Sequence, residues 1–379
     1  MKRTPLTALF ESWNADFLCE LGVQLPLRVG GAGQEYEAAR TGAILADGGD
    51  RAWIRAQGSQ VQGFLQRLLT SDVKNLEPGR GQWSAMLDAK GHWVADLLLF
   101  RVPDEDDEPV ILLDCPSCRV KTVLDCLETF HFGELLTWQE MDLARLLVAG
   151  PNAAKVLSDE NSFFMKEQAE EAPFDDQERA SSLGEAFPLM VDFRIQFLEP
   201  GNWIVERPDR GLTCFEFVGS AESIQKVARN LHEKGVEPTG LVVLDILRVE
   251  NHRPRWGEDF AEANTLPGTG EWHRASFTKG CYTGQEVVAK IDTYGAAPRQ
   301  LCHLSFGNFD KPLSGSELRT QDNKVVGVVT SWVWSPILDS AIGLGIVKRR
   351  ALEVGENLLA TSGSEEVMIT ATPSDKVRE

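Results

Sequence analysis

No apolar run in this sequence is long enough to cross a membrane as a helix. The longest runs are VADLLLF at residues 94–100 and AIGLGIV at 341–347, whereas about 20 residues are needed to span a bilayer. The amino-terminal stretch MKRTPLTALFESWNADF meets acidic residues too early for the apolar part of a signal peptide. We therefore expect a protein with no membrane partner that is located in the cytoplasm.

Basic residues are in the minority. The chain has 38 lysines and arginines against 57 aspartates and glutamates, which gives a formal net charge of -19. This charge excludes a bulk electrostatic attraction to nucleic acid or to an anionic membrane surface. It leaves room for a local basic pocket.

Cysteine and histidine are few and scattered. The seven cysteines are an odd number spread over a long chain, which fits reduced thiols better than a disulfide framework. The six histidines form neither an HxH nor an HExxH pattern, so we expect no metal site. Cys115 and Cys118 form a CxxC after the strand-like VILLD; a redox pair is one interpretation, and the start of a helix is the preferred one.

The chain also lacks a P-loop, and its glycine-rich segment at 28–40 lacks the dinucleotide fingerprint.

What the chain does contain is an irregular alternation of strand and helix patterns. Residues 51–58 and 201–208 are typical of strands, while 59–72 and 221–235 are typical of amphipathic helices. The acidic stretch 167–182 indicates a surface insertion. After Pro298, short strand patterns follow one another between turns, which favours a small β-barrel or sandwich. The predicted fold class is therefore α+β with a carboxy-terminal barrel.

Two acidic residues stand inside apolar strand patterns. Asp96 lies in VADLLLF and Glu216 lies in TCFEFVG. A carboxylate is costly to bury without a partner or a task. Each acid therefore either points to solvent or serves a site, and the pattern alone does not decide between them.

The segment TKGCYTGQEVVAK at 278–290 combines turn residues with the start of a helix. Thr283 and Glu286 have the spacing of a capping box, which predicts a helix beginning at Gly284 and ending at Gly295. Cys281 would then lie just before a helix amino terminus with Lys279 nearby, and both features favour a thiolate. The alternative is a small buried cysteine in a tight turn.

This segment, KGCYTGQEVVAK, resembles the signature of the YgfZ-type folate-binding proteins. Further blocks, among them FLQRLLTSDVKNLEPG, LRVENHRPRWGED and VGVVTSWVWSPILDSAIGLGIV, resemble the wider group that includes the T-protein, the aminomethyltransferase of the glycine cleavage system. The resemblance implies a three-domain cloverleaf around a central hole where tetrahydrofolate binds. It implies a folate-binding region at 1–297, made of two interleaved α+β domains (roughly 50–140, and 1–49 with 141–297), and a barrel at 298–379.

The resemblance also implies roles for individual residues. Asp96 falls at the catalytic aspartate of the T-protein and is expected both to bind the cofactor and to act in catalysis. Glu216 falls at a glutamate that grips the pterin, a task that suits a carboxylate accepting two parallel N–H bonds. Arg248, in LRVENHRPRWGED, is expected among the cofactor-binding residues. Cys281 and Lys279 are expected to be the working residues of the signature loop.

Three functions are considered on this basis. Leu244 replaces a substrate-holding arginine of the T-protein, and RPDRGLTC replaces its run before the pterin glutamate. The YgfZ resemblance implies a tetrahydrofolate-binding accessory protein whose partners are iron-sulfur client enzymes, including tRNA-modifying ones, and because these departures weaken the case for aminomethyl transfer, this function is preferred. The alternative, favoured by the retained Asp96, is a tetrahydrofolate-dependent aminomethyltransferase. A thiol oxidoreductase using Cys115 and Cys118 is the third.

Overall fold

A computed structural model describes residues 2–159, 193–199, 201–208, 211–295, 297–355, 357–363 and 365–374. The chain divides into two compact units. The first unit comprises Met1–Gln62, Asn75–Gln82 and Leu97–Leu244, and the second comprises Gly63–Lys74, Trp83–Asp96 and Asp245–Glu379. The expected division of residues 1–297 into two interleaved domains stays a prediction. The expected insertion at 167–182 lies outside the described residues.

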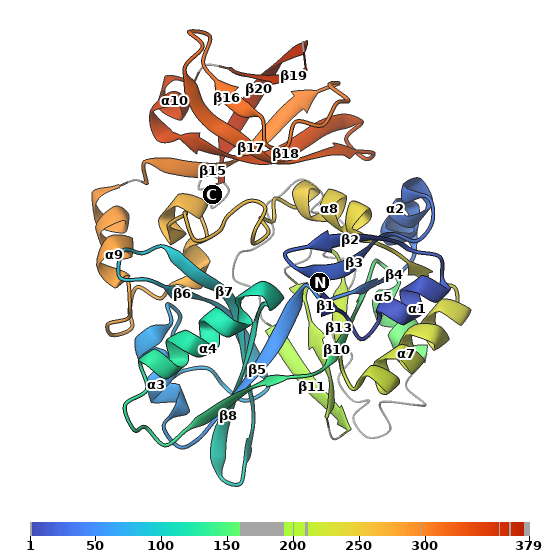
Figure 1. Ribbon diagram of the computed structural model, residues 1–379, viewed down its shortest axis with the longest axis vertical. Coiled ribbons are helices and arrows are strands. Elements are labelled where there is room, and N and C mark those ends of the chain that lie inside the picture. Colours follow the sequence, from blue (N-terminus) through green and yellow to red (C-terminus); the bar gives the residue numbers. More distant parts are fainter. Residues whose placement is uncertain are drawn as a thin grey trace. The chain divides into compact units, whose positions relative to one another are not determined.

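A large mixed sheet provides the framework of the first unit (Figure 1). Its strand order is β14-β4-β10-β13-β12-β11-β6-β7-β8-β5-β9. The strands are β4 (Ile44–Asp47), β5 (Arg51–Gln57), β6 (Arg80–Leu87), β7 (Trp93–Glu105), β8 (Glu108–Pro116), β9 (Thr137–Met141), β10 (Ala144–Ala149), β11 (Phe193–Glu199), β12 (Asn202–Glu206), β13 (Cys214–Gly219) and β14 (Glu237–Pro238). The chain passes between the units inside β6 and inside β7. The strands predicted at 51–58 and 201–208 are β5 and β12.

Helices and a small sheet complete the first unit. The small sheet has the order β1-β3-β2. Its strands are β1 (Lys2–Arg3), β2 (Asp16–Glu20) and β3 (Val23–Arg28). Further helices of this unit are α2 (Ala32–Thr41), the 3-10 helix η1 (Ser117–Arg119), α4 (Val120–Thr129) and α5 (Ala153–Asp159). The CxxC thus spans the end of β8 and the helical turn η1, in agreement with the predicted helix start.

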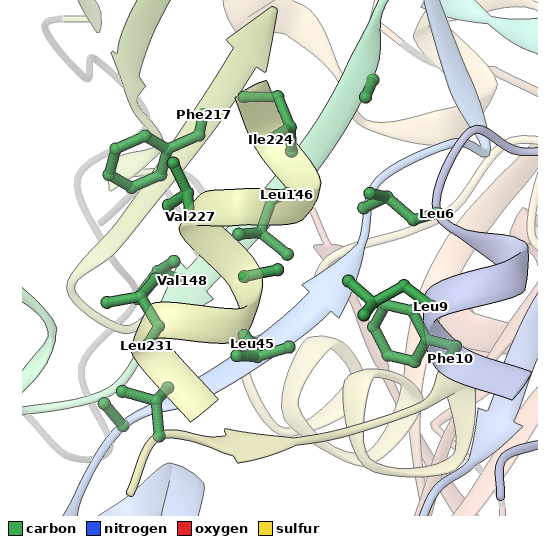
Figure 2. Packing of buried hydrophobic residues seen from close by; sticks show 14 of the residues in the cluster. Leu6, Leu9, Phe10, Leu45, Leu146, Val148, Phe217, Ile224, Val227 and Leu231 are labelled. Atoms are coloured by element: carbon green, nitrogen blue, oxygen red, sulfur yellow. The ribbon is translucent and has the colours of Figure 1, made fainter. Parts of the chain in front are cut away.

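The core of the first unit forms where α1 (Thr7–Ser12) and α7 (Ala221–Glu233) pack on buried strands. Ile224, Val227 and Leu231 follow the spacing of one helix face, and Figure 2 shows them among side chains of β10 and β13. The hydroxyl of Ser220 accepts a hydrogen bond from the Ser223 N–H and caps α7. The helix predicted at 221–235 is confirmed, and Gly235 follows its end with a φ of 89°.

The carboxy-terminal part of the second unit is a closed barrel, as predicted (Figure 1). Its order is β15-β18-β17-β16-β19-β20. The elements are β15 (Arg299–Gly307), β16 (Glu317–Arg319), β17 (Val325–Ser335), β18 (Ser340–Lys348), α10 (Arg349–Val354), β19 (Leu358–Ser362) and β20 (Glu365–Pro373). A Cβ added at Gly343 would lie 2.1 Å from the Ser331 carbonyl oxygen, so only glycine allows β17 and β18 to approach this closely.

Helices precede the barrel along the chain. These are α3 (Val61–Leu68) and α8 (Leu241–Glu250), which both pass from the first unit into the second, the 3-10 helices η3 (Leu266–Thr269) and η4 (Trp272–Arg274), and α9 (Gln285–Tyr294). The helix predicted at 59–72 is α3, although it is shorter than expected. Within the described part of the chain, no helix has the length and apolar character needed to cross a membrane.

The start of α9 differs from the prediction in one respect. The helix follows Gly284 and stops at Gly295 as expected, but its amino-terminal cap is Gly284 itself, with a φ of 81° and no capping side chain. The predicted capping box of Thr283 and Glu286 is therefore wrong. The reason is tertiary: a Cβ at position 284 would lie 2.5 Å from the carbonyl oxygen of Asp88, in the turn between β6 and β7. That close approach requires glycine in the left-handed conformation.

Candidate functional site

Asp96 is a buried acid with a defined partner. Its side chain lies on β7 and is only 5% exposed, next to fully buried apolar residues. Its Oδ1 accepts a hydrogen bond of 2.5 Å from Nη1 of Arg274, which is itself 4% exposed. The alternative that Asp96 points to solvent is therefore wrong. A guanidinium at this distance favours the ionised carboxylate in an apolar environment.

Arg274 is held by several groups of the second unit at once. Its Nε donates to Glu271 at 2.7 Å. The guanidinium carbon lies 3.9 Å from the ring centroid of Trp83 and 5.7 Å from that of Trp93, which are cation-π distances. Burial raises the pKa of Glu271, but the charges of Arg274 and His273 outweigh it, so this pKa lies below its usual value. Sequence reasoning missed Arg274, whose only signal was its charge within a partly apolar segment.

Lys279 is engaged with the backbone at the end of α3. Its Nζ donates to the carbonyl oxygens of Gln66, Leu69 and Ser71 at 2.8, 2.5 and 2.7 Å. An ammonium has three N–H donors, so these bonds use all of them, and burial lowers the pKa of Lys279 to about 8. The geometry is that of a lysine that caps a helix carboxy terminus. The expected catalytic role of Lys279 stays a prediction.

Cys281 lies in the exposed loop between Lys279 and α9. The alternative of a buried cysteine is wrong, because the side chain is exposed. The Lys279 ammonium donates to backbone carbonyls, so it is committed to the α3 end. The expected reactivity of Cys281 therefore depends on its exposure and on the following helix, and its functional role stays a prediction.

Glu216 belongs to a buried ion network in the first unit. It is fully buried on β13, and both of its oxygens are bound. Oε1 accepts from Arg145 of β10, and Oε2 accepts from Nη1 of Arg207 at 2.8 Å. Because both oxygens are engaged inside the protein, the solvent-facing alternative is wrong for Glu216 as well.

Asp114 completes this network at the end of β8. It accepts from Nε of Arg51 at 2.8 Å and from Nη1 of Arg145 at 2.9 Å. Burial raises the pKa of Asp114, but the arginines Arg145 and Arg51 outweigh it, so this pKa lies well below its usual value. Sequence reasoning missed these arginines; the available signal was a charged residue inside the otherwise apolar ARLLVA of β10.

The guanidinium of Arg248 is hydrogen-bonded to several groups of the second unit. Its Nε donates to Asp245, its Nη1 to Asp259 and to a carbonyl oxygen, and its Nη2 to Ser331 of the barrel. Nη2 also lies 2.8 Å from Glu258. A guanidinium has five N–H donors, and these partners account for all of them. Nothing in this arrangement supports the expected contact of Arg248 with a cofactor, which stays a prediction.

The two cysteines of the CxxC lie in unlike environments. Cys115 is completely buried in β8, whereas Cys118 is exposed. A redox pair needs an accessible nucleophilic thiol at its first position, so the geometry does not favour the oxidoreductase. Among the described residues, no group of three or more His, Cys, Asp or Glu side chains is placed to hold a metal ion.

Known proteins of one superfamily are similar to this chain along almost its whole length. Residues 6–190 match the GCVT N-terminal domain, and residues 299–377 match the glycine cleavage T-protein C-terminal barrel domain. Aminomethyltransferase from Halalkalibacterium halodurans is 26% identical over 381 residues, covering 98% of this chain and 98% of the relative. Aminomethyltransferase from Bacillus subtilis is 28% identical over 360 residues, covering 94% of this chain and 93% of the relative.

A solved structure shows the same fold. The crystal structure of glycine cleavage system aminomethyltransferase T from Bartonella henselae superposes with a TM-score of 0.84 at 21% identity, covering 100% of this chain and 98% of that one. The predicted α+β fold of the T-protein kind, with its carboxy-terminal barrel, is therefore confirmed.

The expected accessory function in iron-sulfur enzyme maintenance is wrong. Relatives that match over 94–98% of this chain are named aminomethyltransferase, and none of these findings supports the YgfZ-type assignment. The expectation depended on one loop, residues 279–286, whose lysine the structure places in a helix cap. A local loop decides function less well than similarity along the chain, and the replacement at Leu244 does not outweigh that similarity.

Proposed function

Because this chain belongs to the glycine cleavage T-protein superfamily, we propose that it is a tetrahydrofolate-dependent aminomethyltransferase. The observation that carries the proposal is the similarity over 94–98% of the chain to proteins named aminomethyltransferase. Tetrahydrofolate is the cofactor that this family uses, in agreement with the expected cofactor. The aminomethyl donor is proposed to be a lipoyl carrier protein, and the cytoplasmic location belongs to the same proposal.

The surroundings of Asp96 fit a reduced folate. Tetrahydrofolate supplies an amine that accepts the one-carbon unit. Asp96 is a carboxylate paired with Arg274 beside the indole rings of Trp83 and Trp93. A carboxylate held ionised in this way accepts a hydrogen bond from an amine N–H and orients it.

The surroundings of Glu216 fit the cofactor less well. A pterin edge would need the carboxylate oxygens that Arg145 and Arg207 already occupy, in a side chain with no exposed surface. We therefore propose that Asp96 acts in the transfer reaction and assign no catalytic role to Glu216. The pterin contact of Glu216 stays a prediction with its own test below.

The proposal is tested with purified protein, tetrahydrofolate and an aminomethyl-lipoyl carrier protein. Transfer moves the one-carbon unit from the carrier sulfur to tetrahydrofolate, releases ammonia and leaves the dihydrolipoyl carrier. We expect ammonia release that requires both substrates and that Asp96→Asn reduces by roughly 100-fold or more, as for a group that acts in the transition state.

The matched control is Asp104→Asn, a change of the same chemistry near the far end of β7, where Asp104 makes an exposed ion pair with Arg101. This variant should turn over like the unchanged protein. Ammonia release that stays at background with an active carrier and bound folate would reject the proposed transferase activity. Turnover that Asp96→Asn leaves unaltered would remove Asp96 from the chemistry.

A further inference from the structure

We propose that Arg274 is the positioning residue of Asp96: it holds the carboxylate in one orientation and keeps it anionic. The catalytic part of this inference rests on the proposed function. The geometric and electrostatic part concerns the ion pair itself and is tested separately.

The guanidinium of Arg274 is fixed from three directions. Nη1 donates to Asp96 at 2.5 Å, Nε donates to Glu271 at 2.7 Å, and the plane lies over the indole of Trp83 at 3.9 Å. With 4% exposure, the side chain has little freedom to leave this position. The direction of the Nη1–H bond, and with it the orientation of Asp96, is therefore set by groups other than Asp96.

The backbone of Arg274 is anchored as well. The hydroxyl of Thr70 donates to the Arg274 carbonyl oxygen at 2.6 Å and accepts from the Ala85 N–H at 2.8 Å. The Ser276 N–H donates to the Thr70 carbonyl oxygen at 2.9 Å. Thr70 thus connects η4 to β6, the strand that precedes β7 in the chain, and fixes the base of the arginine side chain.

The charges around the pair explain why Asp96 needs this arginine. Glu271 shares the guanidinium, His273 lies 3.6 Å from the Glu271 carboxylate, and Arg253 acts on Glu271 at longer range. Without Arg274, Asp96 would be a buried acid that has lost the cation it shares with Glu271. Both burial and a neighbouring carboxylate favour proton uptake. A protonated Asp96 could no longer serve as an anionic acceptor for the folate amine.

The first test follows the protonation of Asp96 without any folate. In Arg274→Ala, we expect the unfolding equilibrium constant to rise with pH more steeply than in the unchanged protein, by up to a further tenfold per pH unit between about pH 4 and 7, because native Asp96 then holds a proton that the unfolded chain has released. Adding Asp96→Asn to Arg274→Ala should remove the part of the slope that Asp96 causes, while any slope from Glu271 or from acids elsewhere is common to the two variants and cancels in the comparison. In the presence of Arg274, Asp96→Asn should leave the slope of the unchanged protein as it is.

A second variant guards against loss of folding. Arg274→Met retains an apolar stem over Trp83 while removing the charge, and it should show the same slope and the same dependence on Asp96. If Asp96→Asn leaves the pH slope unchanged in both Arg274 variants, then Arg274 does not set the charge of Asp96 and the proposal is overturned.

The second test measures catalysis and separates positioning from mere support of the fold. In Arg274→Ala, kcat for aminomethyl transfer should fall about 100-fold, the loss expected when a reacting group is misplaced, while KM for tetrahydrofolate changes little. Millimolar guanidinium chloride should restore much of the rate in Arg274→Ala. Sodium chloride at equal concentration should not, and Asp96→Asn should gain nothing from guanidinium.

The matched control for rescue is Arg319→Ala, which removes a guanidinium from an exposed ion pair with Glu317 on the barrel. Its rate should be unchanged and insensitive to guanidinium. An inactive but folded Arg274→Ala that guanidinium fails to rescue would contradict positioning. If the unchanged protein has no transfer activity, the proposed function fails, and the pH slopes of the first test still decide whether Arg274 controls Asp96.

Discussion

The ammonium nitrogen of Lys279 lies 2.5 Å from the carbonyl oxygen of Leu69, at the residue that follows α3. The last carbonyls of a helix have no partners within the helix, and here a lysine from a segment 210 positions later in the chain satisfies them. The lysine of the signature loop thus has a structural task that its sequence context did not indicate.

Replacing Lys279 by methionine should lower the free energy of unfolding by about 1.5–3 kcal/mol, because hydrogen bonds to a charged donor are lost and the carbonyls are left without their partner. Urea unfolding at neutral pH measures the change. Lys290→Met is the control, since Lys290 is exposed on α9, and it should shift the free energy by no more than about 0.5 kcal/mol. Equal losses in the two variants would remove the capping role.

Asp47 should make the first unit less stable as the pH rises. Burial raises its pKa to about 7, while Thr4 and the Gly49 N–H provide its hydrogen bonds. The native carboxyl therefore binds a proton between pH values of about 4 and 7 that the unfolded chain does not bind. The resulting stability is fully present below the unfolded pKa and is lost as the pH passes through 7.

Asp47→Asn should remove this contribution, which amounts to roughly 1.4 kcal/mol for each pH unit in that window. Thermal or urea unfolding between pH 4 and 8 measures it, and the variant should be the more stable protein at pH 8. Asp16→Asn, at an exposed ion pair with Arg28, should keep the slope of the unchanged protein. A slope that survives Asp47→Asn would show that another group is responsible.

Glu216→Gln should destabilise the protein by about 3–5 kcal/mol, because Arg145 and Arg207 would lose the charge that compensates them in a buried site. Denaturant unfolding measures this, with the exposed Glu233→Gln on α7 as a control that should change little. Tetrahydrofolate titrated against the folded variant, followed by tryptophan fluorescence, examines the predicted pterin contact. Unaltered affinity would exclude that contact, whereas unaltered stability would contradict the structural role.

Iodoacetamide should alkylate Cys281 in the native protein together with the exposed Cys19 and Cys118. The buried cysteines Cys115, Cys214 and Cys302 should react only after unfolding, because the thiolate must be accessible to attack. Peptide mass mapping at several times measures the order. Cys281→Ser should retain tetrahydrofolate binding. A Cys281 that reacts no faster than Cys302 would contradict the exposed loop.

Local patterns in the sequence were sufficient for many of the elements. The apolar spacing of Ile224, Val227 and Leu231 predicted α7, and the strand patterns after Pro298 predicted a barrel. These predictions succeeded because periodic burial depends on neighbouring residues along one helix or strand. The capping box at Thr283 failed for the opposite reason, since the turn at Asp88 decided the conformation of Gly284.

The sequence by itself determined that Asp96 and Glu216 are acids in apolar strands and therefore need partners. Only the tertiary structure decided which partners they have: Arg274 lies 178 positions from Asp96, and Arg145 lies 71 positions from Glu216. Ion pairs between distant segments leave no periodic trace in either segment, because each partner satisfies its own strand or helix pattern independently of the other. The charge and orientation of these acids are properties of the folded chain, set by how its strands and loops bring the guanidinium groups to them.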